Sequence, residues 1–374
     1  MRKDVIAVII GIGSYNDLGI IRSCGEAGIQ PIYITNDSHP IIPIWKSKYL
    51  LETIVSEIFE DKILSILVAL WKKYNKKLVV FPASDNAVKI LDDNYNKLPK
   101  DIIISHAKGK IGNLMNKAIM ANLALSAGLN VPRTIEFDLT TPHVDCILNY
   151  PLIIKPIKSL EGEKTDITIC KNNLEFEKNS LILKRKGYKK ILIQDYIHSE
   201  TSREIGITGI SYLNGEIEIH GYIDKIRNRS NINNFGKYYS NQELPIHVSL
   251  KEFMRKCGYV GIFDTDFIEN DGKLYFIECN YRNGAYGYAT TFAGFNMPLR
   301  WVNNCLGIVN DGISDLRNVT FMEERTDFLN VLDKTMTFRS WFKDFINTDV
   351  CLFWNKRDIK PLLRMPYFIK KFFK

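Results

Sequence analysis

The first hundred residues alternate between short apolar runs and stretches with helical character. Residues 5–10, VIAVII, are continuously apolar, as expected for a strand that is covered on both faces. A helical stretch follows at 15–27. The pattern then repeats, with further strands predicted at QPIYIT and KKLVVFPAS and further helices at 57–74 and DNAVKILDDNY. Such alternation favours a small doubly wound parallel sheet, here an α/β domain over residues 1–111.

Composition restricts the class of protein further. A chain of 374 residues is long enough for two or three domains, and 45% hydrophobic and 25% charged residues match globular averages. Extensive disorder and a membrane channel fit poorly, and no run reaches the roughly 18 apolar residues that span a bilayer. The seven cysteines are scattered without a C-x-x-C pair. This pattern indicates neither a zinc site nor a disulfide framework, and it favours a reducing cytoplasm.

The turn after the first apolar run contains Gly11 and Gly13. It is similar to a dinucleotide-binding turn, but the third glycine of G-x-G-x-x-G is missing and position 16 is Asn. A tight turn that requires glycine is the better explanation. A Rossmann NAD(P)-dependent oxidoreductase is kept as the alternative from another enzyme class.

The architecture changes near residue 112. NLMNKAIMANLALSAGLNVPRT has helical periodicity and closes at Gly128, and YPLIIKPIKS and KKILIQDYI are predicted strands. Two alternating strands, at about 203–213 and 216–226, are joined by Asn214-Gly215, a strong hairpin signal. A helix at 248–257 precedes a second hairpin, VGIFDTDFIENDGKLYFIECNYRNG. The strands after residue 112 are therefore mostly antiparallel, which is an α+β pattern.

The second hairpin carries three oxygen-bearing side chains. Asp266 lies on its first strand, and Glu278 and Asn280 lie two residues apart on its second strand, so that these two share a face. Folding at the turn brings the two carboxylates together between apolar neighbours, which is costly without a partner. Magnesium removes that cost, and magnesium bound by few carboxylates usually also binds substrate phosphates. A surface hairpin with solvated acids is the alternative.

Two lysines upstream favour a nucleotide polyphosphate. Lys155 lies inside the apolar run PLIIKP, and Lys117 opens the helix that follows residue 112. A single buried lysine is usually paired or extends its charged end to solvent. Two lysines ahead of a magnesium-type carboxylate set instead indicate phosphate groups as their partner.

The order Lys117, Lys155, ILIQDYI, then TDF and FIECNYR resembles the ATP-grasp superfamily of carboxylate–amine ligases, and most closely its D-aspartate ligase-like branch. LGIIRS after the first strand and FPASD at the third agree with that branch. The resemblance implies a Rossmann-like pre-ATP-grasp domain followed by a two-lobed ATP-grasp fold. The implied divisions are 1–111 for the first domain, 112–189 for the small lobe, 190–310 for the nucleotide and metal-binding lobe, and 311–374 for a C-terminal closing segment.

The resemblance also implies which residues bind ATP. Lys117 and Lys155 would contact its phosphates, and Lys155 would also act in catalysis. Glu204 would bind the ribose hydroxyls, with Glu200 as the alternative. Lys225 and Arg227 would be further phosphate contacts. The hinge that binds adenine through backbone groups would be formed by Gln194, Asp195, Tyr196 and Ile197.

The remaining implied positions are catalytic. Asp266, Glu278 and Asn280 would bind two magnesium ions, or manganese, and Arg282 would neutralise the γ-phosphate or the acceptor carboxylate. A substrate carboxylate would attack the γ-phosphate to give an acyl phosphate, and an amine would then displace phosphate to give an amide. The enzyme would be a ligase that forms C–N bonds. A degenerate ATP-grasp domain that only binds nucleotide or a partner is the alternative.

Two departures from the family pattern bear on substrate and loop closure. The loop KPIKSLEGEKTDI, expected to cover the phosphates, offers only Ser159 and Gly162 where the family is richer in small residues. D-alanine–D-alanine ligases place an arginine two residues before the first metal carboxylate, where this chain has Asp264. Ligation of D-alanine to D-alanine is therefore not expected. Asp264 either accepts a hydrogen bond from a substrate amine or faces solvent.

The net charge of +8 is concentrated at one end, because residues 355–374 hold seven Lys/Arg and one Asp. This placement argues against nucleic acid as a partner. On a helical wheel, PYFIKKFFK separates apolar residues from lysines, which suits an anionic membrane surface. Docking of residues 362–374 on their own domain is the alternative. The hypothesis is a cytoplasmic enzyme, peripheral at the inner membrane face, that joins an amino acid to a surface polysaccharide or cell-wall precursor. A homodimer is the default expectation.

Overall fold

The structure is a computed structural model that describes residues 4–36, 43–58, 60–140, 148–157, 166–199, 201–229, 232–313 and 315–362. Three features singled out in the sequence lie outside these residues. They are Glu200, most of the predicted phosphate-covering loop (158–165), and the basic aromatic tail after residue 362.

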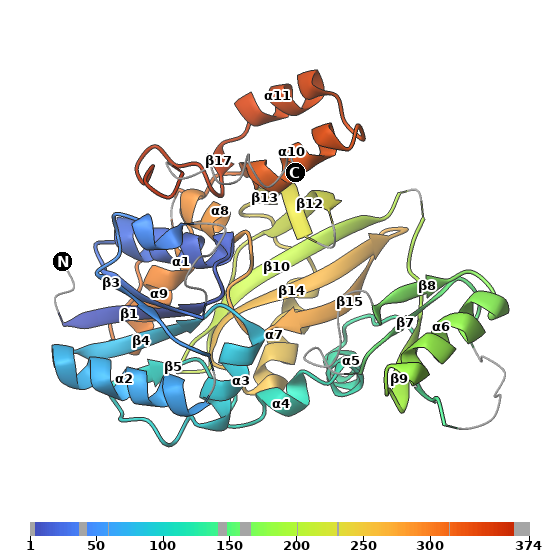
Figure 1. Ribbon diagram of the computed structural model, residues 1–374, viewed down its shortest axis with the longest axis horizontal. Helices are drawn as coiled ribbons and strands as arrows, with labels where there is room; N and C mark the ends of the chain where they lie inside the picture. The colour runs from blue at the N-terminus through green and yellow to red at the C-terminus, as the bar shows by residue number, and fades with distance from the viewer. Residues whose placement is uncertain are drawn as a thin grey trace.

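Five parallel strands form the N-terminal sheet, in the order β3-β2-β1-β4-β5. Its central strand, β1 (Val5–Gly11), is buried along its whole length. Helix α1 (Tyr15–Glu26) covers one face, and α2 (Glu60–Tyr74) and α3 (Asp85–Asp93) cover the other (Figure 1). The predicted doubly wound parallel sheet is therefore present. The remaining elements are β2 (Pro31–Thr35), β3 (Glu52–Val55), β4 (Lys77–Pro82), β5 (Ile102–Ile104) and the short 3-10 helix η1 (Ile44–Lys46).

A buried carboxylate organises the connection to the second part of the chain. Asp92, near the end of α3, accepts hydrogen bonds from the backbone N–H groups of Ala107 (2.6 Å), Gly109 (3.1 Å) and Ile111 (2.7 Å). These bonds fix the residues that lead into α4 (Ile111–Leu114) and α5 (Lys117–Ser126). The start of α5, and with it Lys117, is thus held by the N-terminal domain.

A four-stranded antiparallel sheet, ordered β6-β9-β7-β8, forms a small lobe at one side of the molecule (Figure 1). Helix α6 (Asn173–Arg185) packs on the face that carries Leu152, Ile154, Ile191 and Ile193. Because neighbouring residues of a strand alternate between faces, Lys155 and Gln194 lie on the other face. The strands are β6 (Thr134–Asp138), β7 (Leu152–Lys155), β8 (Thr168–Cys170) and β9 (Lys190–Asp195), so this sheet extends past residue 189.

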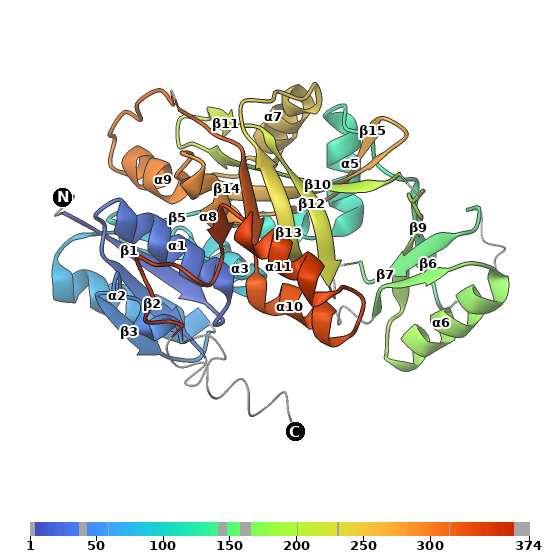
Figure 2. The ribbon, with the colours of Figure 1, turned by 90° about the horizontal axis from the view of Figure 1, so that it is seen from above.

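The largest sheet has eight strands and follows the order β15-β14-β10-β12-β13-β16-β17, with β11 paired to β10. Helix α7 (Ile246–Cys257) and α5 cover one face of β10, β14 and β15 (Figure 2). The strands are β10 (Arg203–Ser211), β11 (Ile217–Ile219), β12 (Tyr222–Arg229), β13 (Ile232–Tyr239), β14 (Gly261–Asn270), β15 (Lys273–Asn280), β16 (Val319–Met322) and β17 (Val350–Cys351).

The strand predicted at 216–226 is broken in two, which corrects the sequence analysis. β11 ends at Ile219 and β12 begins at Tyr222. Between them, Gly221 has a φ of 65°, and a Cβ at this position would lie 1.8 Å from the carbonyl oxygen of Tyr239. Only glycine, which has no Cβ, fits this close approach, and the chain bends there. β12 then pairs with a different part of β10 than β11 does.

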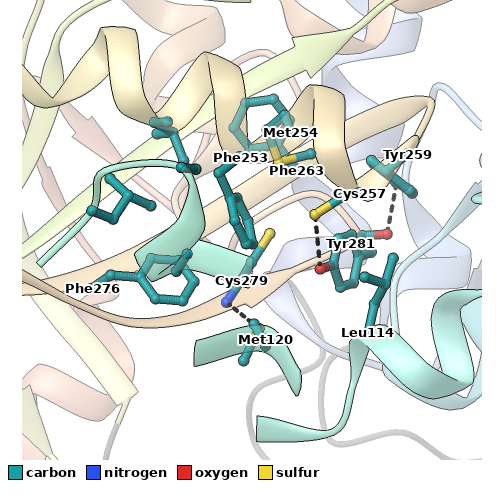
Figure 3. Packing of buried hydrophobic residues seen from close by; sticks show 14 of the residues in the cluster. Leu114, Met120, Phe253, Met254, Cys257, Tyr259, Phe263, Phe276, Cys279 and Tyr281 are labelled. Carbon is teal, nitrogen blue, oxygen red and sulfur yellow. Dashed lines mark hydrogen bonds between the residues drawn. The ribbon is translucent and has the colours of Figure 1, made fainter. Parts of the chain in front are cut away.

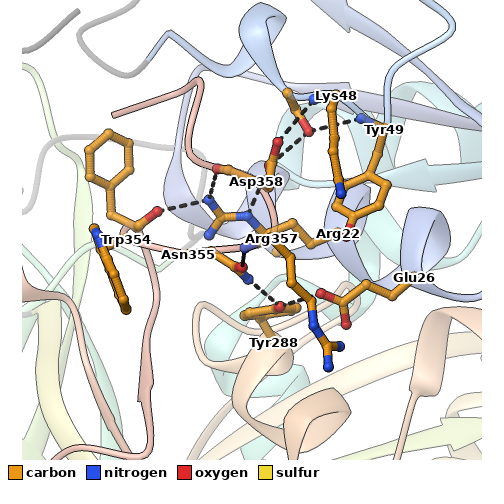
Figure 4. A network of polar contacts seen from close by, with 12 residues as sticks. Arg22, Glu26, Lys48, Tyr49, Tyr288, Trp354, Asn355, Arg357 and Asp358 are labelled. Atoms are coloured by element: carbon orange, nitrogen blue, oxygen red, sulfur yellow. Dashed lines mark hydrogen bonds and ion pairs between the residues drawn. The ribbon is translucent and has the colours of Figure 1, made fainter. Parts of the chain in front are cut away.

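The C-terminal segment returns to the N-terminal domain and closes the molecule. Arg22 of α1 and Asp358 are completely buried and joined by a 3.1 Å ion pair. The Arg22 guanidinium also donates to the carbonyl oxygens of Leu352 (3.0 Å) and Phe353 (2.8 Å) (Figure 4). The helices of this half are α8 (Gly287–Phe292), α9 (Met297–Cys305), α10 (Glu324–Leu332) and α11 (Phe338–Ile346). Within the described ranges, the helices are all too short or too polar to cross a bilayer.

Candidate functional site

The hairpin of β14 and β15 places its polar side chains in register. Asp266 is directly opposite Glu278, and Asp264 is directly opposite Asn280. Directly paired residues of antiparallel strands lie on the same face, so all four side chains share one face of the sheet. The predicted set Asp266, Glu278 and Asn280 is therefore brought together. A bulge follows Asp266, after which Phe267 pairs with Phe276.

The opposite face of this hairpin is apolar and fixes its orientation. Phe263, Phe276 and Cys279 pack against Phe253 and other residues of α7 in a buried cluster (Figure 3). A shift of one residue in either strand would bury the acids and expose the aromatic rings. The cost of that exchange determines which face the acids occupy.

Lys225 joins this polar face from β12. It pairs in register with Glu204 of β10, and its ammonium group is hydrogen-bonded to the Asp266 carboxylate. Burial alone would lower the pKa of Lys225, but the surrounding carboxylates of Asp266, Asp264 and Glu204 outweigh it and raise the pKa. The protein thus has a fixed cation beside the predicted metal ligands, which suits binding of an anion.

Lys155 approaches the same region from the small lobe. Only 6% of this residue is exposed, and its Nζ donates to Gln194 Oε1 at 2.7 Å. Burial, followed by the charge of Lys117, lowers the pKa of Lys155 to about 8, against the opposing effect of the Glu278 carboxylate. The charges of both Lys117 and Glu278 act on Lys155, so the two lysines and the hairpin carboxylate share one electrostatic environment.

The predicted adenine hinge is the end of β9 and the residues after it. Gln194 is buried and also donates to Thr134 Oγ1 at 2.7 Å, so its side chain is held by Lys155 on one side and β6 on the other. The backbone N–H of Asp195 donates to the carbonyl oxygen of Arg133, and Tyr196 stacks on His198 with ring centroids 5.4 Å apart. Asp195, Tyr196 and Ile197 are half-buried at the edge of the small lobe.

Arg282 connects the hairpin to the N-terminal domain. Its Nε donates to Asp85 Oδ1 at 2.7 Å, at the start of α3, and its Nη2 donates to Asn280 Oδ1 at 3.4 Å. Asn283 donates to Asn16 Oδ1 at 2.8 Å, and Asn16 donates back to the Asn283 carbonyl oxygen at 3.0 Å. The carboxyl edge of the parallel sheet therefore closes one end of the site.

Two predicted nucleotide contacts are placed differently from the others. Arg227 is held by both carboxylate oxygens of Asp327 (3.0 and 2.8 Å) and by Asp344 (2.7 Å) in the C-terminal helices. A bulge between Asp224 and Arg227 turns this side chain away from the face that carries Lys225. Glu204 shares the polar face but is exposed at its end.

The structure excludes one of the two alternatives for Asp264, namely exposure to solvent. This residue is 5% exposed and accepts a 2.5 Å hydrogen bond from the Tyr286 hydroxyl, so it does not face solvent. Burial and then the neighbouring Asp266 raise the pKa of Asp264 to about 7, against the influence of Lys225. Tyr286 was not predicted from the sequence. Gly206 was not predicted either, and a Cβ at this position would lie 2.3 Å from the Tyr286 hydroxyl. A glycine inside a strand was an available signal of such a close approach.

The turn between β1 and α1 is filled by an acidic side chain of the protein. Asp17 Oδ2 accepts from the backbone N–H groups of Gly13 (2.8 Å) and Ser14 (3.0 Å) and from the Tyr33 hydroxyl (2.8 Å). In a dinucleotide-binding turn, such N–H groups bind a phosphate. A Cβ at Gly11 would lie 2.3 Å from the Asp17 carboxylate. The glycines therefore accommodate Asp17, which disfavours the NAD(P) alternative.

The available oxygen ligands fit magnesium better than a metal ion whose ligands all come from the protein. In the described part of the chain, no three His, Cys, Asp or Glu side chains gather closely enough to form a metal centre. Asp266, Glu278 and Asn280 supply two carboxylates and an amide oxygen on one face. Magnesium is usually bound by one or two carboxylates together with substrate phosphates, so this smaller oxygen set is sufficient for it.

Two curated proteins are similar in sequence, and both are ligases. The D-aspartate ligase of Enterococcus faecium is 22% identical over 326 residues, which cover 79% of this chain and 75% of that ligase. The D-alanine–D-alanine ligase of Fusobacterium nucleatum is 27% identical over 178 residues, or 44% of this chain. The chain spans only 55% of that second ligase. No family model matches the chain.

Solved structures decide the fold. The N5-carboxyaminoimidazole synthetase of Staphylococcus aureus, complexed with ADP, has a TM-score of 0.67 at 16% identity and covers 88% of this chain and 86% of its own. The L-amino acid ligase of Bacillus licheniformis has a TM-score of 0.63 at 16% identity and covers 85% and 79%. The chain has the ATP-grasp fold. The predicted resemblance to ATP-grasp ligases is confirmed, because both sequence relatives are ligases and the matched structures share this fold.

Proposed function

We propose that this protein is an ATP-dependent ligase that joins a carboxylate to an amine through an acyl-phosphate intermediate. One observation carries the proposal. The backbone N–H of Lys117 donates to the carbonyl oxygen of Ile157, two residues after Lys155, at 2.9 Å, and Glu278 is paired in register with Asp266, which binds Lys225. In the proposal, the lysines would bind phosphate groups and the hairpin oxygens would bind magnesium, between the two lobes of the ATP-grasp fold.

Each group has a distinct role in the proposal. Lys117, Lys155 and Lys225 would hold the phosphates as point charges, and the buried Gln194 would keep the Lys155 ammonium aimed between the lobes. Asp195, Tyr196 and Ile197 would offer the edge of the small lobe to adenine, and Glu204 would accept from the ribose hydroxyls. Asp266, Glu278 and Asn280 would hold magnesium, which when bound neutralises charge on the phosphate oxygens.

In the first step, an oxygen of the substrate carboxylate attacks the γ-phosphorus of ATP and the bond to ADP breaks. Arg282 stands at this end of the site and would orient the carboxylate, while Asp85 keeps the guanidinium in place. In the second step, an amine nitrogen attacks the carbonyl carbon and phosphate leaves, with loss of one proton from nitrogen. Closure of the lobes would keep water from the intermediate.

We further propose a polymer-linked or lipid-linked acceptor, such as a surface polysaccharide or cell-wall precursor, with the enzyme acting in the cytoplasm at the inner membrane face. The support is the basic aromatic pattern of the C-terminal sequence. Small-molecule carboxylate and amine substrates are consistent with the ligases that the chain resembles. A homodimer is part of the proposal as the default assembly.

The test is substrate-dependent release of ADP and phosphate in a screen of carboxylate and amino-acid pairs, followed by product mass. Glu278→Ala should lower the rate about 100-fold or more, since it removes an oxygen that would stabilise charge in the transition state. The matched control is Glu269→Gln on the same hairpin, because Glu269 pairs with Arg203 away from the polar face. Its activity should stay near wild type.

The controls separate failure of the function from failure of the fold. Thermal unfolding of both variants should match wild type, since Glu278 is only half-buried. Unchanged turnover in Glu278→Ala would contradict the assignment of the site. Binding of ATP without any ADP release across the screen would instead support a domain that only binds nucleotide.

A further inference from the structure

The hairpin formed by α10 and α11 stands on the outside of the molecule, over β12 and β13 (Figures 1 and 2). Three apolar residues of α11, spaced by four, lie along one side of the helix: Phe338, Phe342 and Ile346. Their exposed fractions are 58%, 47% and 62%. We call these three residues the α11 edge. Large apolar residues are usually buried, whereas no residue of α11 is buried.

Other aromatic residues of α11 already make the contacts that attach the helix. The Trp341 ring packs edge-on against Phe328 of α10 with centroids 4.9 Å apart, and it stacks on Phe345 at 5.1 Å. Phe338 and Phe342 stack on each other at 5.8 Å on the outer side. Phe338 also stacks on Trp341 at 6.1 Å and is nevertheless more than half exposed. The α11 edge therefore adds little to the packing of the hairpin on its own domain.

The acidic groups of the hairpin are all bound by other groups of the protein. Asp327 and Asp344 bind Arg227, and Asp333 binds Arg229. Glu324 accepts from the backbone N–H groups of Phe353 and Trp354. All four carboxylates of α10, α11 and their connection are thus neutralised or bound by the protein itself.

Three cationic groups of the hairpin are exposed. Arg339 and Lys343 directly follow Phe338 and Phe342 on α11, and Lys334 lies in the connection before this helix. Within the part of the chain that the structure describes, none of these three has a carboxylate within ion-pair distance. The outer surface of the hairpin therefore combines an apolar stripe with uncompensated positive charge.

We propose that the α11 edge docks on an anionic lipid surface, with the helix lying in the plane of the membrane interface. Phenylalanine and isoleucine would enter the boundary between head groups and acyl chains, while the flanking cations bind anionic head groups. A second copy of the chain is a poorer partner for this surface. Three side chains on a nine-residue helix offer less area than a stable dimer needs, and a symmetric pair would bring like charges together.

This inference uses only described residues and does not depend on the proposed ligase activity. The test is sedimentation of the full-length protein with vesicles of phosphatidylcholine alone and with added phosphatidylserine. Wild type should bind the phosphatidylserine vesicles, and more weakly as salt increases. Phe338→Ser with Phe342→Ser should lower the partition coefficient at least tenfold. Arg339→Glu with Lys343→Glu should lower it about fivefold or more per charge, since each cation contributes about 1 kcal/mol.

The matched control removes two apolar residues that are even more exposed, on other surfaces, Leu174→Ser on α6 with Val248→Ser on α7. It should bind vesicles like wild type. Thermal unfolding identifies any variant that does not fold. Equal vesicle binding by wild type and the Phe338/Phe342 variant would overturn the proposal. A wild-type dimer that becomes monomeric in this variant by light scattering, without vesicle binding, would overturn it in favour of self-association.

Discussion

At the scale of single residues, the protonation of a side chain in this site depends strongly on the charges around it. Lys155 illustrates this, because it is buried on the inner face of a four-stranded sheet and its ammonium donates to the side chain of Gln194. The nearby charge of Lys117 adds to the cost of keeping Lys155 charged, and Glu278 reduces it. A polyphosphate placed between the lysines would reverse that balance.

We predict that ATP binding depends on pH through Lys155. Its pKa of about 8 lies below the usual range, so the lysine is charged below pH 8 and loses its proton above it. Because phosphate groups favour the charged form, ATP binding should take up a proton above pH 8. The affinity should therefore fall by up to about tenfold per pH unit from pH 8 upward.

Calorimetric titration with ATP between pH 7 and 9.5 measures this slope. Lys155→Met should bind more weakly at pH 7 and show a flat profile above pH 8, whereas Lys72→Met, at an exposed position of α2, should behave as wild type. A wild-type affinity that stays constant up to pH 9.5 would contradict the prediction.

At the scale of elements, the turn between β1 and α1 shows how glycine and acid positions depend on each other. Ser14 caps α1 and donates its hydroxyl to Asp17, and Asp17 in turn accepts from the backbone of Gly13 and Ser14. The buried carboxylate leaves room only for glycine at position 11. The turn places Asn16 against Asn283, and so positions the N-terminal domain at the end of the site.

We predict that Gly11→Ala destabilises the protein by about 2–3 kcal/mol, because its Cβ would overlap a carboxylate that hydrogen bonds hold in place. Gly112→Ala is the matched control. Its Cβ would only contact the flexible Lys89 side chain at 3.5 Å, within helix α4. This variant should be as stable as wild type or up to about 1 kcal/mol more stable. Urea unfolding monitored by circular dichroism compares the two, and equal loss of stability would contradict the argument.

At the scale of the whole molecule, the first helix binds the C-terminal segment through one buried arginine. Arg22 lies in the first helix, and Leu352, Phe353 and Asp358 lie more than 300 residues later. Asp358 also accepts from Ser47 Oγ at 2.8 Å and from the Lys48 N–H at 2.9 Å (Figure 4). The guanidinium satisfies several buried acceptors at once, which a lysine ammonium could not reach together.

We predict that Arg22→Met lowers the free energy of unfolding by about 3–5 kcal/mol, because it leaves a buried carboxylate without its cation and two carbonyl groups without their donor. Arg22→Lys should restore little of this loss. The control Lys97→Ala breaks an exposed ion pair with Glu60 and should change stability by no more than about 0.5 kcal/mol. Chemical unfolding of the three variants tests this, and an Arg22→Met protein as stable as wild type would refute it.

Much of the candidate site followed from local sequence patterns. Alternation in β14 and β15 placed Asp266, Glu278 and Asn280 on one face, and the lysine inside PLIIKP indicated Lys155. Contacts between distant segments had no such signal. The hydrogen bond from Tyr286 to Asp264 and the bond from Arg282 to Asp85 join residues whose spacing carries no period, and the bulge that directs Arg227 to Asp327 is absent from the hydrophobic pattern.

The sequence by itself determined the classes of element and the chemistry of the polar face, because side-chain periodicity is a local property of strands and helices. Only the tertiary structure decided that Asp17 occupies the glycine turn, that Asp264 is buried, and that Arg22 binds Asp358 in the C-terminal segment. These outcomes depend on which buried polar groups find partners when distant segments pack together. The pairing of buried polar groups is a property of the whole fold, because each partner comes from a distant segment whose position the local sequence pattern does not predict.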